Sequence, residues 1–150
     1  MSWKEFEEDS PELASLGVMN LNRKIVYLAI LKKDGSPHLN PVTPFIGNGM
    51  LFMFTEPTSP KIRDLRRDGR YAMHCSVSRE GSLIEFLVSG IAEEITDSVI
   101  RDQAVKIAAA PVVDDSYALF EFQVMRVLAV EYDEENKKVI RRWHREKTGN

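Results

Sequence analysis

The sequence contains only one cysteine, Cys75, among its 150 residues. An intramolecular disulfide is therefore impossible, and a zinc site built from several thiolates is excluded. The three histidines, His38, His74 and His144, are far apart along the chain, and no two of them have the spacing of metal ligands. The sequence therefore predicts no metal site, and it names no catalytic acid, base or nucleophile.

Long apolar runs and an excess of basic residues are also missing. No apolar run approaches the roughly 20 residues that a membrane-spanning helix needs, so we expect no membrane partner. The formal net charge is -3, so the chain lacks the basic face that nucleic-acid phosphates select, and we expect no nucleic-acid partner. The acidic first residues differ from a cationic, apolar leader, which favours a cytoplasmic protein.

The eight glycines are scattered at turns and form no Gly-rich phosphate loop. The alternation of strands and long helices that builds a parallel nucleotide-binding sheet is absent as well. What is present is an ordinary globular composition, with 43% hydrophobic and 29% charged residues. The length predicts a single domain over 1–150, in which residues 1–20 form a helical lead-in.

From Arg23 onward, stretches rich in β-branched and aromatic residues alternate with turn residues. The predicted strands are 24–33, 37–48, 50–56, 70–78, 83–96, 118–133 and 138–144. Asp34–Gly35 and Asn48–Gly49 are hairpin signals that join the first three strands into a meander. Three prolines mark segment 37–48 as an edge or bulged strand, and Gly90 predicts a bulge or a close backbone approach. Seven strands, mostly joined by hairpins, predict a mainly β protein: an antiparallel barrel decorated with short helices.

Capping residues predict where the helices begin and end. A helix over 11–16 begins after Ser10 and ends at Gly17, and a looser turn precedes it. A second helix, 98–109, follows Asp97 as its cap. Its predicted apolar stripe consists of Val99, Ala104, Ile107 and Ala108.

Four polar residues gather between strand 50–56 and a predicted helix over 59–67: Thr55, Thr58, Ser59 and Lys61. One interpretation is plain helix capping, with Ser59 as the cap, Pro60 in the first position and the lysine in water. The other is an anion site, because unpaired N–H groups, hydroxyls and an ammonium together suit a phosphate. The residues alone leave both interpretations open.

The order of these elements resembles the FMN-binding split barrel of the pyridoxamine phosphate oxidase superfamily. The resemblance is carried by three stretches, DGSPHLNPV (34–42), GMLFMFTEPTSPKIRDLRRDGRYAM (49–73) and VSGIAEE (88–94), and it covers residues 20–96. It implies a six- to seven-stranded antiparallel split β-barrel that forms a homodimer with FMN at the interface. It further implies that the residues of the T-x-x-x-S-x-K segment contact the FMN phosphate, and here these are Thr55, Ser59 and Lys61.

The resemblance implies further cofactor contacts on two other strands. Backbone groups around Val42 and Thr43 would face the flavin ring, and Asn40 and Thr43 would reach the phosphate or the ring edge. Trp143, on the last strand, would either flank the ring of the other subunit or cover the end of its own barrel.

Several departures from the family pattern separate this chain from authentic pyridoxamine phosphate oxidases. Those enzymes have arginines at the positions of Asn40 and Pro60, and each missing guanidinium removes a bidentate phosphate contact. Glu85 stands for a glutamine that they direct at the flavin ring. Their C-terminal arginine- and histidine-bearing substrate signature is missing, since the tail here reads RRWHRE (141–146). We therefore reject pyridoxamine phosphate oxidation as the activity.

What the resemblance then implies is an FMN- or deazaflavin-dependent oxidoreductase that transfers a hydride to a small substrate. Haem and FAD are less favoured cofactors. The alternatives are a module that binds the cofactor without catalysis, or a barrel whose site is vestigial.

Overall fold

The structure is a computed structural model of the chain and describes residues 1–78, 80, 83–111 and 113–146. The helices are α1 (Trp3–Asp9), α2 (Pro11–Leu21), α3 (Lys61–Arg67) and α4 (Ser98–Ala108). The strands are β1 (Val26–Leu31), β2 (Pro37–Val42), β3 (Phe45–Gly47), β4 (Met50–Thr55), β5 (Arg70–Cys75), β6 (Glu85–Glu94), β7 (Ala118–Tyr132) and β8 (Lys138–His144). All eight belong to one antiparallel sheet, which confirms the predicted mainly β split barrel.

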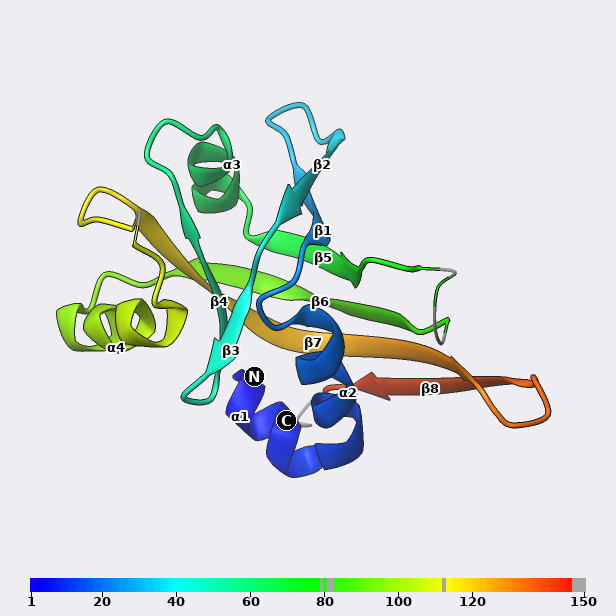
Figure 1. Ribbon diagram of the computed structural model, residues 1–150. Coiled ribbons are helices and arrows are strands. Elements are labelled where there is room, and N and C mark those ends of the chain that lie inside the picture. The colour runs from blue at the N-terminus through cyan, green and yellow to red at the C-terminus, as the bar shows by residue number, and fades with distance from the viewer. Residues whose placement is uncertain (79, 81–82, 112, 147–150) are drawn as a thin grey trace.

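The long strand β7 accounts for the split in the barrel (Figure 1). It pairs with β6 along one edge, whereas its other edge is shared by two strands. Residues 118–121 pair with β4, and residues 126–132 pair with β8. Between these two stretches the N–H of Val124 donates to the carbonyl of Met1 at 2.7 Å. The N-terminal segment therefore fills the gap where β4 and β8 diverge.

The predicted strand 37–48 is divided in two. It breaks at Thr43–Pro44, so that β2 pairs with β1 while β3 pairs with β4. Since β2 and β3 lie at opposite ends of the strand order, the expected edge position is confirmed and the three-strand meander is wrong. Pro44 has no N–H to continue a ladder, and its carbonyl accepts from the N–H of Arg23 at 2.9 Å.

Both predicted hairpin turns form, because their residues reach the left-handed region that such turns need. Gly35 has φ +82°, and Asn48 and Gly49 have φ +51° and +74°. Gly90 occupies a bulge in β6, as predicted. A Cβ added there would lie 1.9 Å from the carbonyl oxygen of Gln123, so glycine allows the two backbones to meet.

The N-terminal helices differ from the prediction. Residues 3–9 form the helix α1 rather than a looser turn, because Ser2 and Glu5 make a reciprocal capping box. The second helix also runs through Gly17 to Leu21. Gly17 does not end the helix but allows close packing of two aromatic rings. A Cβ at this position would lie 2.6 Å from the Trp3 ring and 2.7 Å from the Phe86 ring.

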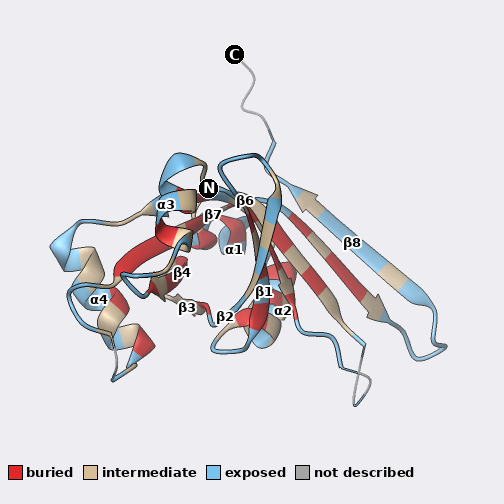
Figure 2. Cartoon of the chain, turned by 90° about the horizontal axis from the view of Figure 1, so that it is seen from above, coloured by how far each residue is buried: buried red, intermediate tan, exposed pale blue. Residues whose placement is uncertain are grey.

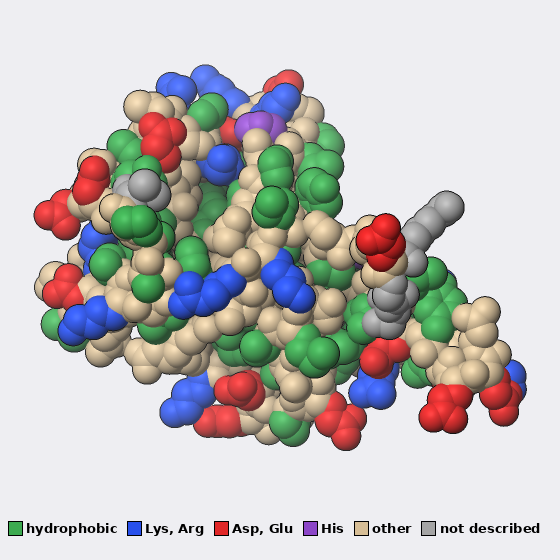
Figure 3. Space-filling view, viewed as in Figure 1, with side chains coloured by type: hydrophobic (Ala, Val, Ile, Leu, Met, Phe, Trp, Pro, Cys, Tyr) green, Lys and Arg blue, Asp and Glu red, His purple; other side chains and the backbone are tan. Residues whose placement is uncertain are grey.

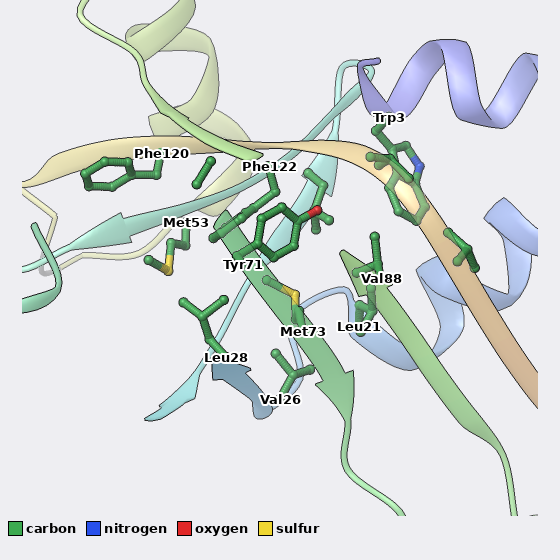
Figure 4. Packing of buried hydrophobic residues seen from close by; sticks show 14 of the residues in the cluster. Trp3, Leu21, Val26, Leu28, Met53, Tyr71, Met73, Val88, Phe120 and Phe122 are labelled. Carbon is green, nitrogen blue, oxygen red and sulfur yellow. The ribbon is translucent and has the colours of Figure 1, made fainter. Parts of the chain in front are cut away.

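The barrel interior holds the main hydrophobic core, which includes Phe6 and Phe86. Figure 4 shows other members of this core, among them Trp3, Leu28, Met73 and Phe122. Buried and less buried residues alternate along the strands that line it, as Figure 2 shows for β6 and β7. A second cluster lies outside the barrel, where α4 packs on β3 and β4.

The cap of α4 is as predicted, with the Asp97 carboxylate accepting from the N–H of Ile100 at 3.0 Å. Its predicted stripe is wrong at Val99, which is 63% exposed, because Ile100 packs on the outer cluster in its place. Within the described ranges, no helix is long and apolar enough to cross a membrane.

Candidate functional site

Thr55 ends β4 at the point where the loop 56–60 leads into α3. By strand alternation its side chain lies on the same face as Leu51 and Met53, which point into the barrel. Thr55 is only 3% exposed, and its hydroxyl has no hydrogen-bond partner among the described residues. Among the described residues, it is the one polar residue that is buried. A buried hydroxyl without a partner costs about 1–3 kcal/mol, a cost that an ordered water or a ligand at this position would offset.

The inner face of β2 presents a second polar group to the barrel. His38, Asn40 and Val42 are half-buried, whereas the residues between them are exposed. Val42 packs against the core. Asn40 Nδ2 and His38 Nδ1 are buried and lack hydrogen-bond partners in the described part of the chain.

Of the four buried side-chain atoms without partners in the described ranges, three therefore lie on the inner faces of β2 and β4. β4 ends and β2 begins beside α3, which covers this end of the barrel (Figure 1). In space-filling view the surface between α3 and β2 is hollowed, with hydrophobic side chains at its base and Lys or Arg and His side chains beside it (Figure 3). We refer to this region, defined by His38, Asn40, Thr55, Ser59 and Lys61, as the α3 end.

Helix α3 begins at Lys61, two residues later than the predicted start. Pro60 takes the cap position, and Ser59 Oγ accepts only a long hydrogen bond of 3.4 Å from the N–H of Lys61. The predicted capping role of Ser59 is therefore weak. With seven residues α3 is also too short to supply much of a helix dipole, so the donors of the α3 end are side chains.

Lys61 is half-buried, and no carboxylate of the described residues lies within ion-pair distance of its ammonium. The neighbouring arginines are engaged. Arg66 binds both oxygens of Glu94 at 2.6 Å, which lowers the pKa of that carboxyl, and Arg67 binds Asp64 at 2.7 Å. In the described part of the chain, Lys61 and Arg63 are the cations of α3 without an ion pair, and of these two Lys61 is half-buried whereas Arg63 is exposed.

Two other residues of the sequence analysis lie apart from these donors. Thr58 donates its hydroxyl to the carboxylate of Glu56 within the loop. Thr43 is exposed at the break between β2 and β3, next to the half-buried Val42. The expected ring contacts of Val42 and Thr43 remain predictions.

Trp143 lies near the N-terminal helices and not at the α3 end. Its indole packs edge-on against Phe6 at 4.8 Å between ring centroids, and its N–H donates to Asp9 at 2.6 Å. Trp143 also lines a cavity of about 440 Å³ together with Leu128 and Arg142. Contact with a flavin of another subunit remains a prediction for this residue.

His38 is the polar residue of this region that the sequence analysis missed. A period-two pattern across His38, Asn40 and Val42 places all three on one face, and that pattern is readable from the sequence. The contact between His38 and Asp64 of α3 is not, because it joins residues 26 positions apart across the barrel end.

Comparisons with known proteins agree with this fold. A family model described as pyridoxamine 5'-phosphate oxidase matches residues 20–131. No curated protein matches the sequence. The structure is similar to PhzG from Burkholderia lata 383 in complex with tetrahydrophenazine-1-carboxylic acid, with TM-score 0.66 and 15% identity over 97% of this chain and 89% of that one.

Two further solved structures are similar at comparable levels. A FAD-binding protein from Mesorhizobium loti has TM-score 0.62 and 20% identity, over 77% of this chain and 92% of that one. A heme binding protein from Mycobacterium smegmatis has TM-score 0.61 and 20% identity over 79% of this chain. The present chain spans only about half, 53%, of that protein's length. At these identities the likeness shows the fold alone.

Proposed function

Since this chain belongs to the pyridoxamine 5'-phosphate oxidase family, we propose that it binds FMN at the α3 end and acts as a flavin- or deazaflavin-dependent oxidoreductase. The observation that carries the proposal is the buried Thr55 hydroxyl without a partner among the described residues, and the Asn40 amide nitrogen on β2 is buried without a partner as well. The chain folds with these polar atoms desolvated, and a ligand rich in acceptors would offset that cost.

A phosphate monoester fits the chemistry of these donors. The hydroxyls of Thr55 and Ser59, the amide N–H groups of Asn40 and the ammonium of Lys61 all donate, and phosphate oxygens accept. The bound flavin would supply the hydride chemistry. The chain's own residues would hold the phosphate and so fix the position of the cofactor.

The two absent arginines bear on the kind of activity. Asn40 donates neutral hydrogen bonds and Pro60 donates none, so the α3 end holds less positive charge than a site with two guanidinium groups. This supports a reductase that uses a loosely held flavin or a diffusing deazaflavin, and it argues against pyridoxamine phosphate oxidation.

We propose further that the protein is a homodimer that uses the outer face of β1, β2 and β6. Leu39, Tyr27 and Ile91 point outward there and are 65%, 45% and 36% exposed. Exposed apolar residues on neighbouring strands favour a protein partner, and a second copy would cover them across a two-fold axis. Analytical ultracentrifugation should show a dimer that Leu39→Glu converts to monomer. Val99→Glu, at an equally exposed apolar residue on α4, should leave the dimer intact.

Haem is a second candidate ligand, favoured by His74 on the same outer face. Its Nδ1 lies 2.6 Å from the carbonyl of Cys75. If Nδ1 carries the proton and donates to that oxygen, the Nε2 lone pair is available to a metal. A protein similar in structure is described as heme binding.

A visible absorption spectrum of the purified protein tests both ligands, because flavin and haem absorb at different wavelengths. FMN titration followed by flavin fluorescence quenching then tests the placement. Lys61→Ala should weaken FMN binding by about 1.5–3 kcal/mol, or roughly one to two decades in Kd. The control Lys106→Ala, on α4, should bind like wild type. Equal FMN affinity in wild type and Lys61→Ala would show that the phosphate does not lie at the α3 end.

Turnover separates an enzyme from a module that only holds the cofactor. A reductase consumes reduced FMN or reduced deazaflavin when a small oxidised acceptor is present, and a binding module does not. The measurement is the rate of cofactor oxidation under anaerobic conditions, with and without protein.

A further inference from the structure

His38 occupies a position at the α3 end that none of the proposed phosphate donors explains. Its side chain is 26% exposed. His38 lies two residues before Asn40 on β2, so both side chains are on the same inner face. Its Nδ1 is buried and makes no hydrogen bond to the described residues. The other ring nitrogen, Nε2, is not among the buried atoms that lack partners, so it is open to solvent or to a ligand.

A carboxylate from α3 faces the buried nitrogen of His38. Asp64 Oδ2 lies 3.7 Å from Nδ1, which is too far for a hydrogen bond but within reach of an ion pair if the imidazole is protonated. The side chain of Asp64 is only 14% exposed, and its other oxygen binds Arg67 at 2.7 Å. Arg67 in turn donates to the carbonyl of Leu31, which ties α3 to the β1–β2 hairpin.

The charged group that faces His38 is Asp64 of α3, and Asp64 is itself bound by Arg67 of the same helix. Lys61 lies one helical turn before Asp64. The cross-strand neighbour on β1 is the apolar Ile30. When both ring nitrogens of His38 carry a proton, the Nδ1–H is on the side of Asp64 and the Nε2–H is on the side away from that carboxylate.

We propose that His38, held by Asp64, is a phosphate-binding residue of the α3 end. The ligand class is a phosphate monoester, so this inference rests on the proposed function. Protonated His38 and Lys61 would then supply two positive charges, while Asn40 and Thr55 supply neutral donors. Anionic phosphate oxygens are the acceptors that these donors suit.

Binding of FMN and of riboflavin, measured by fluorescence quenching at pH 6 and pH 8.5, tests the proposal. Riboflavin lacks the phosphate and serves as the reference ligand. His38→Gln should weaken FMN binding about tenfold at pH 6 and no more than about threefold at pH 8.5, because a neutral imidazole donates a weaker hydrogen bond to phosphate than an imidazolium does. It should leave riboflavin binding unchanged. The matched control is His144→Gln, because His144 is exposed on β8; it should behave like wild type with both ligands.

The outcomes distinguish this inference from the proposed function. If Lys61→Ala weakens FMN binding at pH 6 and His38→Gln does not, the phosphate lies at the α3 end and His38 does not bind it. If neither substitution weakens FMN binding, both proposals are wrong for FMN.

A second probe requires no flavin. The three histidines give three imidazole signals in a ¹H–¹³C NMR spectrum, and His38→Gln assigns one of them. Inorganic phosphate should move the midpoint of the His38 titration to higher pH and leave the His144 midpoint in place. An unchanged His38 midpoint at saturating phosphate would overturn the proposal.

Discussion

The two ends of the barrel are built from opposite kinds of contact. At the α1–α2 end, the rings of Trp3, Phe6 and Phe86 and the bare backbone of Gly17 fill the interior with apolar atoms. The only buried polar side-chain atom without a partner there, among the described residues, is the Trp3 indole nitrogen. At the α3 end such atoms come from β2 and β4. Apolar side chains therefore fill the α1–α2 end, whereas the α3 end has buried polar atoms to which a ligand could form hydrogen bonds.

The strongest way to test this contrast is to remove packing at the first end. Trp3→Ala deletes a side chain that is 1% exposed and contacts Phe6 edge-on. We expect a loss of about 3–5 kcal/mol in the free energy of unfolding, because the cavity cannot fully collapse. Urea denaturation measures it. Met19→Ala, at a residue of α2 that is 60% exposed, should change the stability by less than about 0.5 kcal/mol. Equal losses in the two variants would contradict the packing described for this end.

At the α3 end, substitution should move stability and binding in opposite directions. Thr55→Val keeps the side-chain shape and removes the unpartnered hydroxyl. We expect the free energy of unfolding of the unliganded protein to rise by about 1 kcal/mol, and the affinity for FMN to fall about tenfold. Thermal unfolding and FMN titration measure the two effects. Thr55→Ser retains the hydroxyl and should retain FMN binding. A marked loss of stability in Thr55→Val would mean that the hydroxyl already has a partner.

The smallest expected effect concerns the ion pair that fixes α3 to β6. Arg66 lowers the pKa of Glu94 in the folded protein, so the pair stabilises the fold above the unfolded-state pKa of about 4.5. That stabilisation is lost as pH falls below this value and through the lowered folded-state pKa. Wild type should therefore melt slightly above Glu94→Gln at pH 7, and the difference should vanish in strong acid. A difference in Tm that persists at pH 2 would exclude this ion pair as its cause.

Local chemistry explains which parts of the fold were predictable. The Asp34–Gly35 and Asn48–Gly49 turns and the Asp97 cap depend on residues close in sequence, and all three form as expected. Gly17 was misjudged because its role depends on Trp3 and Phe86, one from another helix and one from β6. The division of strand 37–48 cannot be predicted from its composition, because both halves are strands. The break becomes visible only from their different partners, since β2 pairs with β1 and β3 pairs with β4.

The candidate site shows the same limit. Thr55, Ser59 and Lys61 are recognisable because they follow one another within seven residues. The burial and hydrogen bonding of their side chains cannot be predicted from this spacing. Burial of the Thr55 hydroxyl depends on the barrel interior, and the approach of His38 to Asp64 depends on the placement of α3 over β2.

Segment 37–47 contributes β2 to one end of the strand order and β3 to the other, and this arrangement should affect amide hydrogen exchange. Only Thr43 and Pro44 separate β2 from β3, so a fluctuation that releases this connection loosens both the β1–β2 and the β3–β4 pairings. The amides of these two hairpins should then exchange as one cooperative unit, although they lie far apart in the order of strands. A ligand that restrains Asn40 and Thr55 would bind one residue from each hairpin, and it would slow that shared opening.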